Sequence, residues 1–442
     1  MSLRVTGVTL PDGTSTDLAV ADGVFIDEPH KGARTIDGAG LIALPGLVDL
    51  HTHLREPGLE HSETILSGSR AAAAGGFTAV HAMANTSPVA DSAGVVEQVW
   101  SLGAQHGYVT VRPVGAVTIG LEGQRLSEIG AMAGSRARVR VFSDDGRCVS
   151  DALLMRRALE YVKTFGGVIA QHSQEPRLTE GAQMNESRLS GELGLAGWPA
   201  VAEEAIIARD VLLAHHVGAR LHVCHVSTAG SVDVIRWAKA RGIQVTAEVT
   251  PHHLLLTEEL VRSYDSRFKV NPPLRRDEDV RELRAALADG TIDIVATDHA
   301  PHPLESKECA WEEAAVGMVG LESALHVVQL AMVDTGLIGW ADVAGILSAR
   351  PAAIGQLAGY DDAFRPGTAA NFVLYDPSTS HEFGTADLHG KSVNSPYLGR
   401  ELPGRVVATI HSGYPTVLDG QLVDPRDVAA NAAIETARNH SA

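Results

Sequence analysis

The stretch LIALPGLVDLHTHLREPG, residues 41–58, ends a hydrophobic run with two histidines, an arginine and a Pro-Gly turn. Side chains alternate along a β-strand, so His51 and His53 project to the same side. A strand that finishes in two imidazoles and the guanidinium of Arg55 has more polar groups at its end than packing requires. The stretch therefore predicts a buried strand whose end carries chemistry.

Seven similar strands follow, separated by helical stretches. The eight strand candidates are GLVDLH, FTAVHAMA, VTVRPVGA, RVRVFSD, GVIAQHS, LHVCHVS, IQVTAEV and IDIVATD. Between them, residues 151–163 and 202–216 repeat apolar positions at three- and four-residue steps, as amphipathic helices do. Eight strands with intervening helices predict a (β/α)8 barrel over residues 44–360.

The two ends of the chain have a different texture. Residues 1–43 and 361–442 contain short, turn-bounded β segments such as LRVTGVTL and RVVATIHSG. Chain termini often lie close together, so we expect both ends to form one small β-sandwich domain.

Bulk composition excludes some classes of partner. A chain of 442 residues is long enough for one barrel and a smaller unit, and its formal net charge of -18 argues against nucleic acid. Cys148, Cys224 and Cys309 lie far apart without a C-x-x-C spacing, which favours reduced thiols. With no apolar signal block and no run of about 18 apolar residues, we expect a cytoplasmic protein without membrane contact.

Polar residues that could bind metal close five of the eight strand candidates. In a barrel of this type the active site lies at the C-terminal ends of the strands. Four histidines and two carboxylates from these strand ends suit borderline cations such as Zn²⁺, and six ligands exceed one tetrahedral site, which indicates two metals that share a carboxylate. The residues at these ends are His51, His53, Asp144, Asp145, His172, His225, Asp298 and His299.

A single histidine is more often structural than a metal ligand, and several here fit that interpretation. His252 and His253 are expected to shape the loop after the seventh strand, and His215 and His216 to end a helix. The sequence SDDG would by itself indicate a turn. Convergence of several strand ends favours the metal interpretation for the others.

Seven motifs, in order along residues 44–325, resemble the class I dihydroorotases of the amidohydrolase superfamily. They are DLHTHLREPG, MANTSP, FSDDG, LHVCHVST, EVTPHHLLLT, VNPPLR and ATDHAPH. The resemblance implies reversible hydrolysis of L-dihydroorotate to N-carbamoyl-L-aspartate, a step of de novo pyrimidine biosynthesis. It also implies two Zn²⁺ ions, one held by His51, His53 and Asp298, the other by His172 and His225, with Asp145 bridging them.

The same resemblance implies the residues that bind substrate. Arg55, Asn85 and Asn271 match the contacts to the substrate carboxylate, His302 matches a further contact, and Val316 and Gly317 match a backbone segment against the ring. One departure is visible, because Ala84 stands where the family usually has proline; this change is expected to loosen the loop without abolishing the Asn85 contact.

The expected chemistry agrees with these roles. A metal ion makes hydroxide available near neutral pH and polarises the carbonyl, while Asp298 first takes a proton and then delivers it to the leaving nitrogen. The planar guanidinium of Arg55 suits a carboxylate. Residues 302–317 form a long polar segment after the eighth strand, which we interpret as a lid over the mouth or, alternatively, an irregular surface loop.

Two alternatives remain open at this point. Hydantoinases and allantoinases open cyclic ureides with similar metals, but usually rely on a carboxylated lysine and lack this Arg and Asn pairing. A non-catalytic scaffold for aspartate carbamoyltransferase would be expected to lose metal ligands, and all six are present. We also expect a homo-oligomer, and an association of the working enzyme with that transferase stays open.

Overall fold

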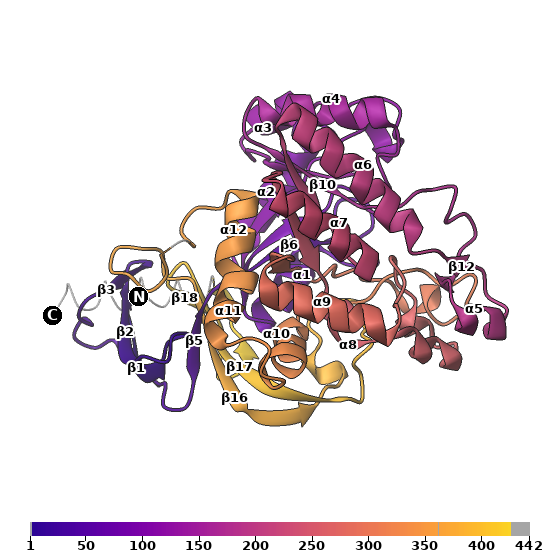
Figure 1. Ribbon diagram of the computed structural model, residues 1–442. Helices are drawn as coiled ribbons and strands as arrows, with labels where there is room; N and C mark the ends of the chain where they lie inside the picture. Colours follow the sequence, from indigo (N-terminus) through magenta and orange to yellow (C-terminus); the bar gives the residue numbers. More distant parts are fainter. Residues whose placement is uncertain (1, 361, 426–442) are drawn as a thin grey trace.

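The strand that leads to His51 and His53 is one of the strands of a barrel. In the computed structural model, which describes residues 2–360 and 362–425, eight parallel strands form this barrel (Figure 1). They are β6 (Leu47–Thr52), β7 (Phe77–Ala82), β8 (Thr110–Pro113), β9 (Val141–Phe142), β10 (Val168–Gln171), β13 (Arg220–Val223), β14 (Val245–Val249) and β15 (Ile294–Val295). Each overlaps one of the eight strand candidates, which confirms the predicted barrel.

Backbone bridges between the strand runs close the barrel. Strands β6, β7 and β8 pair in one run, and β9, β10, β13, β14 and β15 pair in a second. The parallel bridges Gly115–Phe142 and Thr52–His299 join the two runs at both seams. Closure brings the end of β6 beside the segment that follows β15, although these are about 250 positions apart in the chain.

Helices cover the outside of the barrel (Figure 1). Helix α4 shows why they form: the Asp151 side chain accepts a hydrogen bond from the Leu154 amide at its start, and its buried residues recur at helical spacing. The helices are α1 (Ile65–Ala74), α2 (Ala93–His106), α3 (Ile129–Gly134), α4 (Ala152–Lys163), α5 (Arg188–Leu193), α6 (Val201–Val217), α7 (Ala229–Ala240), α8 (Pro251–Leu255), α9 (Asp277–Asp289), α10 (Ala324–Val328), α11 (Trp340–Ala344) and α12 (Arg350–Gly355).

Shorter elements complete the connections. The two-residue strands β11 (Met184–Asn185) and β12 (Gly197–Trp198) pair with each other. Short 3-10 helices span Ile119–Leu121, Glu258–Ser263, Ser266–Phe268, Leu304–Ser306 and Thr385–Asp387, and π-helical turns span Gln329–Val333 and Gly345–Ala349.

The two chain ends form one sheet, as expected. Among the described residues it has nine strands, in the order β19-β18-β17-β16-β5-β1-β2-β3, with β4 on β1. Their bounds are β1 (Ser2–Thr9), β2 (Ser15–Ala21), β3 (Val24–Ile26), β4 (Arg34–Asp37), β5 (Ile42–Pro45), β16 (Phe372–Glu382), β17 (Glu401–His411), β18 (Tyr414–Leu418) and β19 (Gln421–Leu422). The ring of Phe25 in β3 lies 5.5 Å from that of Phe372 in β16, so the sheet folds back on itself around a shared core.

Strand β5 joins the two halves of this sheet and leads into the barrel. It pairs antiparallel with β16, Leu44 opposite Val373, and β6 begins two residues after it ends. The limits of the three segments, 1–43, 44–360 and 361–442, stay a prediction, and residues 426–442 of the last one lie outside the described residues.

The structure also bears on membrane-spanning helices and on the three cysteines. No helix in residues 2–360 or 362–425 is both long enough and apolar enough to cross a membrane. Cys148, Cys224 and Cys309 are free thiols.

Candidate active site

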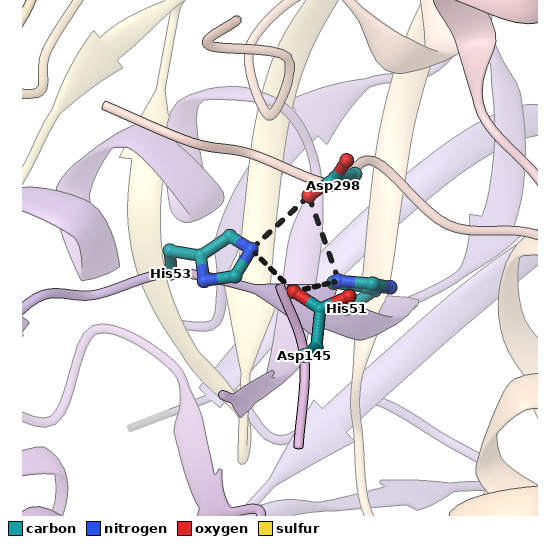
Figure 2. A group of neighbouring side chains, drawn as sticks. All are labelled: His51, His53, Asp145 and Asp298. Carbon is teal, nitrogen blue, oxygen red and sulfur yellow. Dashed lines mark hydrogen bonds and ion pairs between the residues drawn. The ribbon is translucent and has the colours of Figure 1, made fainter. Parts of the chain in front are cut away.

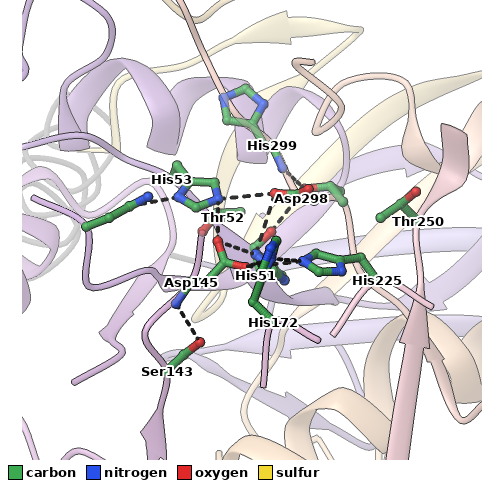
Figure 3. A network of polar contacts seen from close by, with 12 residues as sticks. His51, Thr52, His53, Ser143, Asp145, His172, His225, Thr250, Asp298 and His299 are labelled. Carbon is green, nitrogen blue, oxygen red and sulfur yellow. Dashed lines mark hydrogen bonds and ion pairs between the residues drawn. The ribbon is translucent and has the colours of Figure 1, made fainter. Parts of the chain in front are cut away.

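The polar strand ends predicted to hold metal lie together at the C-terminal mouth of the barrel (Figure 3). His51 lies in β6 and His53 directly follows that strand, whereas the other ligands come from the turns after β9, β10, β13 and β15. All of them are buried; the complete set is His51, His53, Asp145, His172, His225 and Asp298.

The first group contains both histidines of the H-x-H pair (Figure 2). The Nε2 atom of His53 lies 3.1 Å from Asp298 Oδ1 and 3.3 Å from Asp145 Oδ2. The Nε2 atom of His51 lies 3.5 Å from Asp298 Oδ1 and 3.3 Å from Asp145 Oδ2. The four side chains present their ligand atoms to one point.

The second group uses the other oxygen of the same aspartate. Asp145 Oδ1 lies 3.1 Å from His172 Nδ1 and 3.2 Å from His225 Nε2, and these two nitrogens are 2.8 Å apart. Asp145 therefore directs Oδ2 to the first group and Oδ1 to the second, which is the arrangement of a carboxylate shared by two cations.

The histidine tautomers fit metal ligation. His51 Nδ1 lies 2.6 Å from a carboxylate oxygen of Glu248, and His53 Nδ1 lies 2.8 Å from the amide oxygen of Asn85, so both Nδ1 atoms act as donors. In the neutral imidazoles the Nε2 atoms carry the lone pairs, which point toward the two aspartates, and the buried Nε2 of His51 has no hydrogen-bond partner. Metal-ligating histidines show this pattern of an outer donor and an inner lone pair.

Buried carboxylates make the centre favour positive charge. Burial by itself lowers the pKa of His51, but the carboxylates of Asp145, Glu248 and Asp298 outweigh it and hold this pKa well above 6.5. Burial likewise raises the pKa of Asp298, yet the imidazoles of His51 and His53 bring it down to about 2. A divalent cation bound here would supply the positive charge that the imidazoles otherwise take up as protons.

Glu248, which orients His51, was not among the predicted site residues. This buried side chain of β14 accepts a hydrogen bond from His51 Nδ1 at 2.6 Å and one from His222 Nε2 at 2.9 Å. An ionisable residue inside the apolar strand candidate IQVTAEV was the available signal, because buried charges are rare unless paired. Its partners come from strands β6 and β13, which the sequence does not place beside it.

Asp49 is a second residue that the predicted site left out. Its Oδ1 accepts hydrogen bonds from the backbone amides of His51, at 3.1 Å, and Thr297, at 3.0 Å. Burial raises the pKa of this carboxyl to about 6. The side chain joins β6 to the turn that carries Asp298, and its position in the apolar run LVDLH was the signal.

The neighbouring polar residues have structural contacts. Asp144, the first aspartate of SDDG, accepts hydrogen bonds from the amides of Val117 and Thr118 at 2.8 and 2.9 Å. His299 Nδ1 accepts one from the Gly320 amide at 3.2 Å.

The four histidines set aside in the sequence belong to helices. His252 and His253 are buried in α8 rather than in an open loop, because Thr250 and Pro251 start a helix there, and the Thr250 hydroxyl accepts from the His253 amide. His215 and His216 lie in the last turn of α6 and are exposed.

A cavity of about 220 Å³ opens onto the two ligand groups. Every residue predicted to contact substrate lines it, together with four of the six predicted metal ligands. The lining residues are His53, Arg55, Asn85, Asp145, Gly146, His172, Asn271, Asp298, Ala300, His302, Val316 and Gly317. His51 and His225 are not among them. A cavity of this size and polarity suits a small, charged metabolite.

Two loops that carry predicted carboxylate contacts pack closely against each other. Gly58 has φ +95°, and a Cβ there would lie 1.9 Å from the carbonyl oxygen of Ser87. Only glycine permits this approach, which fixes the Arg55 loop against the Asn85 loop. Burial lowers the pKa of Arg55 to about 10, so the guanidinium stays charged at neutral pH.

The loop in which alanine replaces proline is held by backbone hydrogen bonds. The carbonyl oxygen of Ala84 accepts from the amides of Thr86 and Ala90, at 2.9 and 3.0 Å. These bonds constrain the chain on both sides of Asn85; the expected loosening stays a prediction.

Residues 302–317 border the cavity on its outer side. The imidazole Nε2 of His302 donates to the Val316 carbonyl oxygen at 2.8 Å, which closes the loop on itself. Movement of this loop as a lid stays a prediction.

Comparison with known proteins places the chain among close relatives. A family model described as "Dihydro-orotase-like" matches residues 40–231. The curated protein named dihydroorotase from Leifsonia xyli subsp. xyli is 72% identical over 95% of this chain and 97% of its own. Those from Streptomyces coelicolor and Mycobacterium tuberculosis are 63% and 50% identical, over 93% and 96% of this chain and 96% and 100% of their own.

Solved structures share the fold at lower identity. An L-hydantoinase (dihydropyrimidinase) from Arthrobacter aurescens aligns with a TM-score of 0.85 at 23% identity, covering 95% of this chain and 97% of that one. A dihydropyrimidinase from Brevibacillus agri aligns with a TM-score of 0.80 at 21% identity, covering 96% of both chains. This likeness supports the barrel with its terminal sheet.

Proposed function

Since this chain belongs to the dihydroorotase family, we propose that its barrel mouth hydrolyses L-dihydroorotate reversibly to N-carbamoyl-L-aspartate, with two bound Zn²⁺ ions, in pyrimidine biosynthesis. The observation that carries the two-metal part is the position of Asp145, with one carboxylate oxygen toward each ligand group. His51, His53 and Asp298 would hold one ion, and His172 and His225 the other.

Zinc is the metal that the donor atoms favour. Four imidazole nitrogens and two aspartates form a mixed nitrogen and oxygen set, whereas magnesium and calcium prefer oxygen ligands alone. When bound, such ions lower the pKa of water toward neutrality and polarise the amide carbonyl of the ring.

Asp298 is placed to move the proton. Its carboxylate is ionised at neutral pH and lies among the proposed metal ligands, with Oδ1 3.1 Å from His53 Nε2, where it can accept a proton from the nucleophile. Asp298 also lines the cavity, where the same proton can pass to the ring nitrogen as the C–N bond breaks. One carboxylate thus serves first as general base and then as general acid.

The cavity walls orient the substrate. Arg55, Asn85 and Asn271 supply a fixed guanidinium and two amides for the substrate carboxylate, which gives an anion a local positive site on a strongly acidic protein. His302 stays neutral, because burial lowers its pKa to about 3, and with Val316 and Gly317 it faces the ring.

Ring opening of hydantoin or allantoin is the less favoured function. The turn after β9 presents Ser143, Asp144 and Asp145 at the mouth, with no lysine among them to be carboxylated. The hydantoinase structures that align at 20–23% identity support the shared fold and do not bear on the substrate.

The proposal also covers the location and assembly of the enzyme. We propose that it acts on a small-molecule substrate in the cytoplasm as a homo-oligomer. Association with aspartate carbamoyltransferase stays an open alternative. Size measurement of the chain alone and mixed with that transferase tests both assemblies.

The proposed function is tested by turnover of dihydroorotate, hydantoin and allantoin at equal enzyme, with metal analysis of the same sample. We expect dihydroorotate to be the preferred substrate and two zinc ions per chain. Preference for either of the other rings would overturn the substrate, and full activity without bound metal would overturn the mechanism.

A further inference from the structure

Two buried lysines join the loop of residues 302–317 to the neighbouring segment that leads to Asn271. Lys307 is 4% exposed and Lys269 is 5% exposed, and among the described residues neither forms an ion pair within 4.0 Å. A buried ammonium without a carboxylate is costly unless its hydrogen bonds are made, so its contacts need an explanation.

All three donors of Lys307 go to backbone carbonyl oxygens. Its Nζ atom lies 2.7 Å from Ala315 O, 3.0 Å from Gly317 O and 3.3 Å from Lys269 O. Burial, followed by the charge of Lys269, lowers the pKa of this ammonium to about 7. The side chain thus ends at a point where two separate segments of the chain meet.

These two segments are the walls of the proposed substrate cavity. Gly317 lies in the lining segment that follows β15, and Lys269 lies two residues before Asn271 in an adjacent segment. The Lys269 carbonyl also accepts from the Gly317 amide at 2.9 Å, so a single oxygen receives both the ammonium of Lys307 and the backbone of Gly317.

Further contacts strengthen the same junction. Lys269 Nζ donates in return to the carbonyls of Trp311 and Glu312 in the loop, the latter at 3.1 Å, and the Ser266 hydroxyl donates to the Lys307 carbonyl. Asn394 holds the Gly317 carbonyl from another side, at 3.2 Å.

We propose that Lys307 is a positioning residue for substrate: its ammonium sets the separation between Asn271 and the Val316–Gly317 backbone. This inference rests on the proposed function. It assigns Lys307 no contact with the reacting atoms, so its loss acts on substrate binding and leaves the metal ligands and the proton transfer in place.

The test is Lys307→Met, which keeps the length of the side chain and removes the ammonium. We expect KM for dihydroorotate to rise about 10-fold or more, while kcat changes less than about threefold and metal content stays the same. The matched control is Lys163→Met: Lys163 is exposed on α4 and also donates to a carbonyl, Val217 O at 2.7 Å, so kinetics should not change.

Chemical rescue separates positioning from general stability. Lys307 also lines an adjoining cavity of about 470 Å³, through which a small amine can reach the gap left by Lys307→Ala. We expect n-butylammonium to lower KM of Lys307→Ala and to have no effect on the native chain or on Lys163→Met.

Each outcome decides the inference. A folded Lys307→Met with unchanged KM would overturn it, as would a fall in kcat with KM unchanged. If Lys307→Met does not fold, Lys307→Gln is assayed by the same criteria. Failure of the native chain to turn over dihydroorotate would instead reject the proposed function, so the two failures are distinguishable.

Discussion

Two groups of histidines in this molecule lie beside cavities, yet their surroundings differ. His51, His53, His172 and His225 lie at the barrel mouth, around the carboxylates of Asp145 and Asp298. His326, His381 and His389 line a larger cavity, of about 520 Å³, between the barrel and the terminal sheet.

In the second group His326 and His389 bind backbone carbonyls, and the carboxylate of Asp387, 3.6 Å from His381 Nε2, contacts a single histidine. His326 Nδ1 donates to Pro403 O at 2.8 Å, and His389 Nδ1 donates to Asp387 O at 3.0 Å. Burial lowers the pKa of His326 to about 4, whereas the carboxylates at the mouth raise that of His51. The difference teaches that shared acidic partners, more than a local abundance of histidine, define a candidate metal centre.

The largest expected effect removes the shared carboxylate. Asp145→Ala takes one oxygen from each ligand group, so we expect both metals to be lost and kcat/KM to fall on the order of 10⁴-fold or more. Metal analysis coupled to the dihydroorotase assay measures this. If Asp145→Ala retains two metals, a shared carboxylate is not what distinguishes the histidines at the mouth from those of the second group.

A smaller loss of activity is expected when Asp298, the second carboxylate of the first histidine group, is changed. Asp298→Asn keeps an oxygen near His53 but cannot accept the proton, so kcat should fall about 10³-fold. Metal bound by His172 and His225 should remain. If kcat of a metal-loaded Asp298→Asn stays near the native value, Asp298 is not the general acid and base.

Removal of Arg55 tests whether binding of the substrate carboxylate can be lost while metal binding at the histidines is kept. Arg55→Met removes the guanidinium and should lower kcat/KM about 100-fold, chiefly through KM, because a charge-assisted hydrogen bond is lost. Metal content should equal that of the native chain. Unchanged kinetics would show that another cation binds the carboxylate.

Glu248 tests whether an orienting carboxylate matters as well as the ligands. Glu248→Gln should weaken zinc binding about 10- to 100-fold, since the hydrogen bond to His51 Nδ1 loses its charge, and added zinc should restore activity. The matched control is Glu322→Gln, because buried Glu322 accepts from the His389 amide in the second group. Equal zinc loss in both variants would contradict the assignment.

The smallest effect on activity is expected in the second group. His326→Gln should leave kcat/KM within about twofold, because no substrate or metal contact is proposed there. The pKa of His326 lies below its ordinary value of 6.5, so the native stability it contributes is complete above pH 6.5 and falls as the pH drops toward 4. The variant should lack about 2 kcal/mol of this pH-dependent unfolding free energy, measured by urea denaturation at pH 7 and pH 5.

Much of the site could be predicted because strand ends are local features. The alternation of β6 places His51 and His53 on one side, and the rule that barrel sites lie at the C-terminal ends of strands collects the remaining ligands. The predicted fold class is confirmed. The roles of the individual residues stay predictions until the variants above are measured.

Other features could not be predicted from local sequence. Within SDDG the two aspartates look equivalent, but Asp144 turns to the amides of Val117 and Thr118, while Asp145 turns to the histidines. Lys307 reads as one charge in a polar loop, yet it is buried among three carbonyls.

The sequence by itself determined the barrel, the terminal sheet and the residue types at the strand ends, because periodicity and turn residues act over a few positions. Tertiary structure alone decided which partners those residues meet. His51 meets Glu248, 197 positions away, only because closure of the barrel brings β6 and β14 to the same mouth. Such contacts depend on how strands pair around the whole ring, and no short stretch of the chain encodes that arrangement.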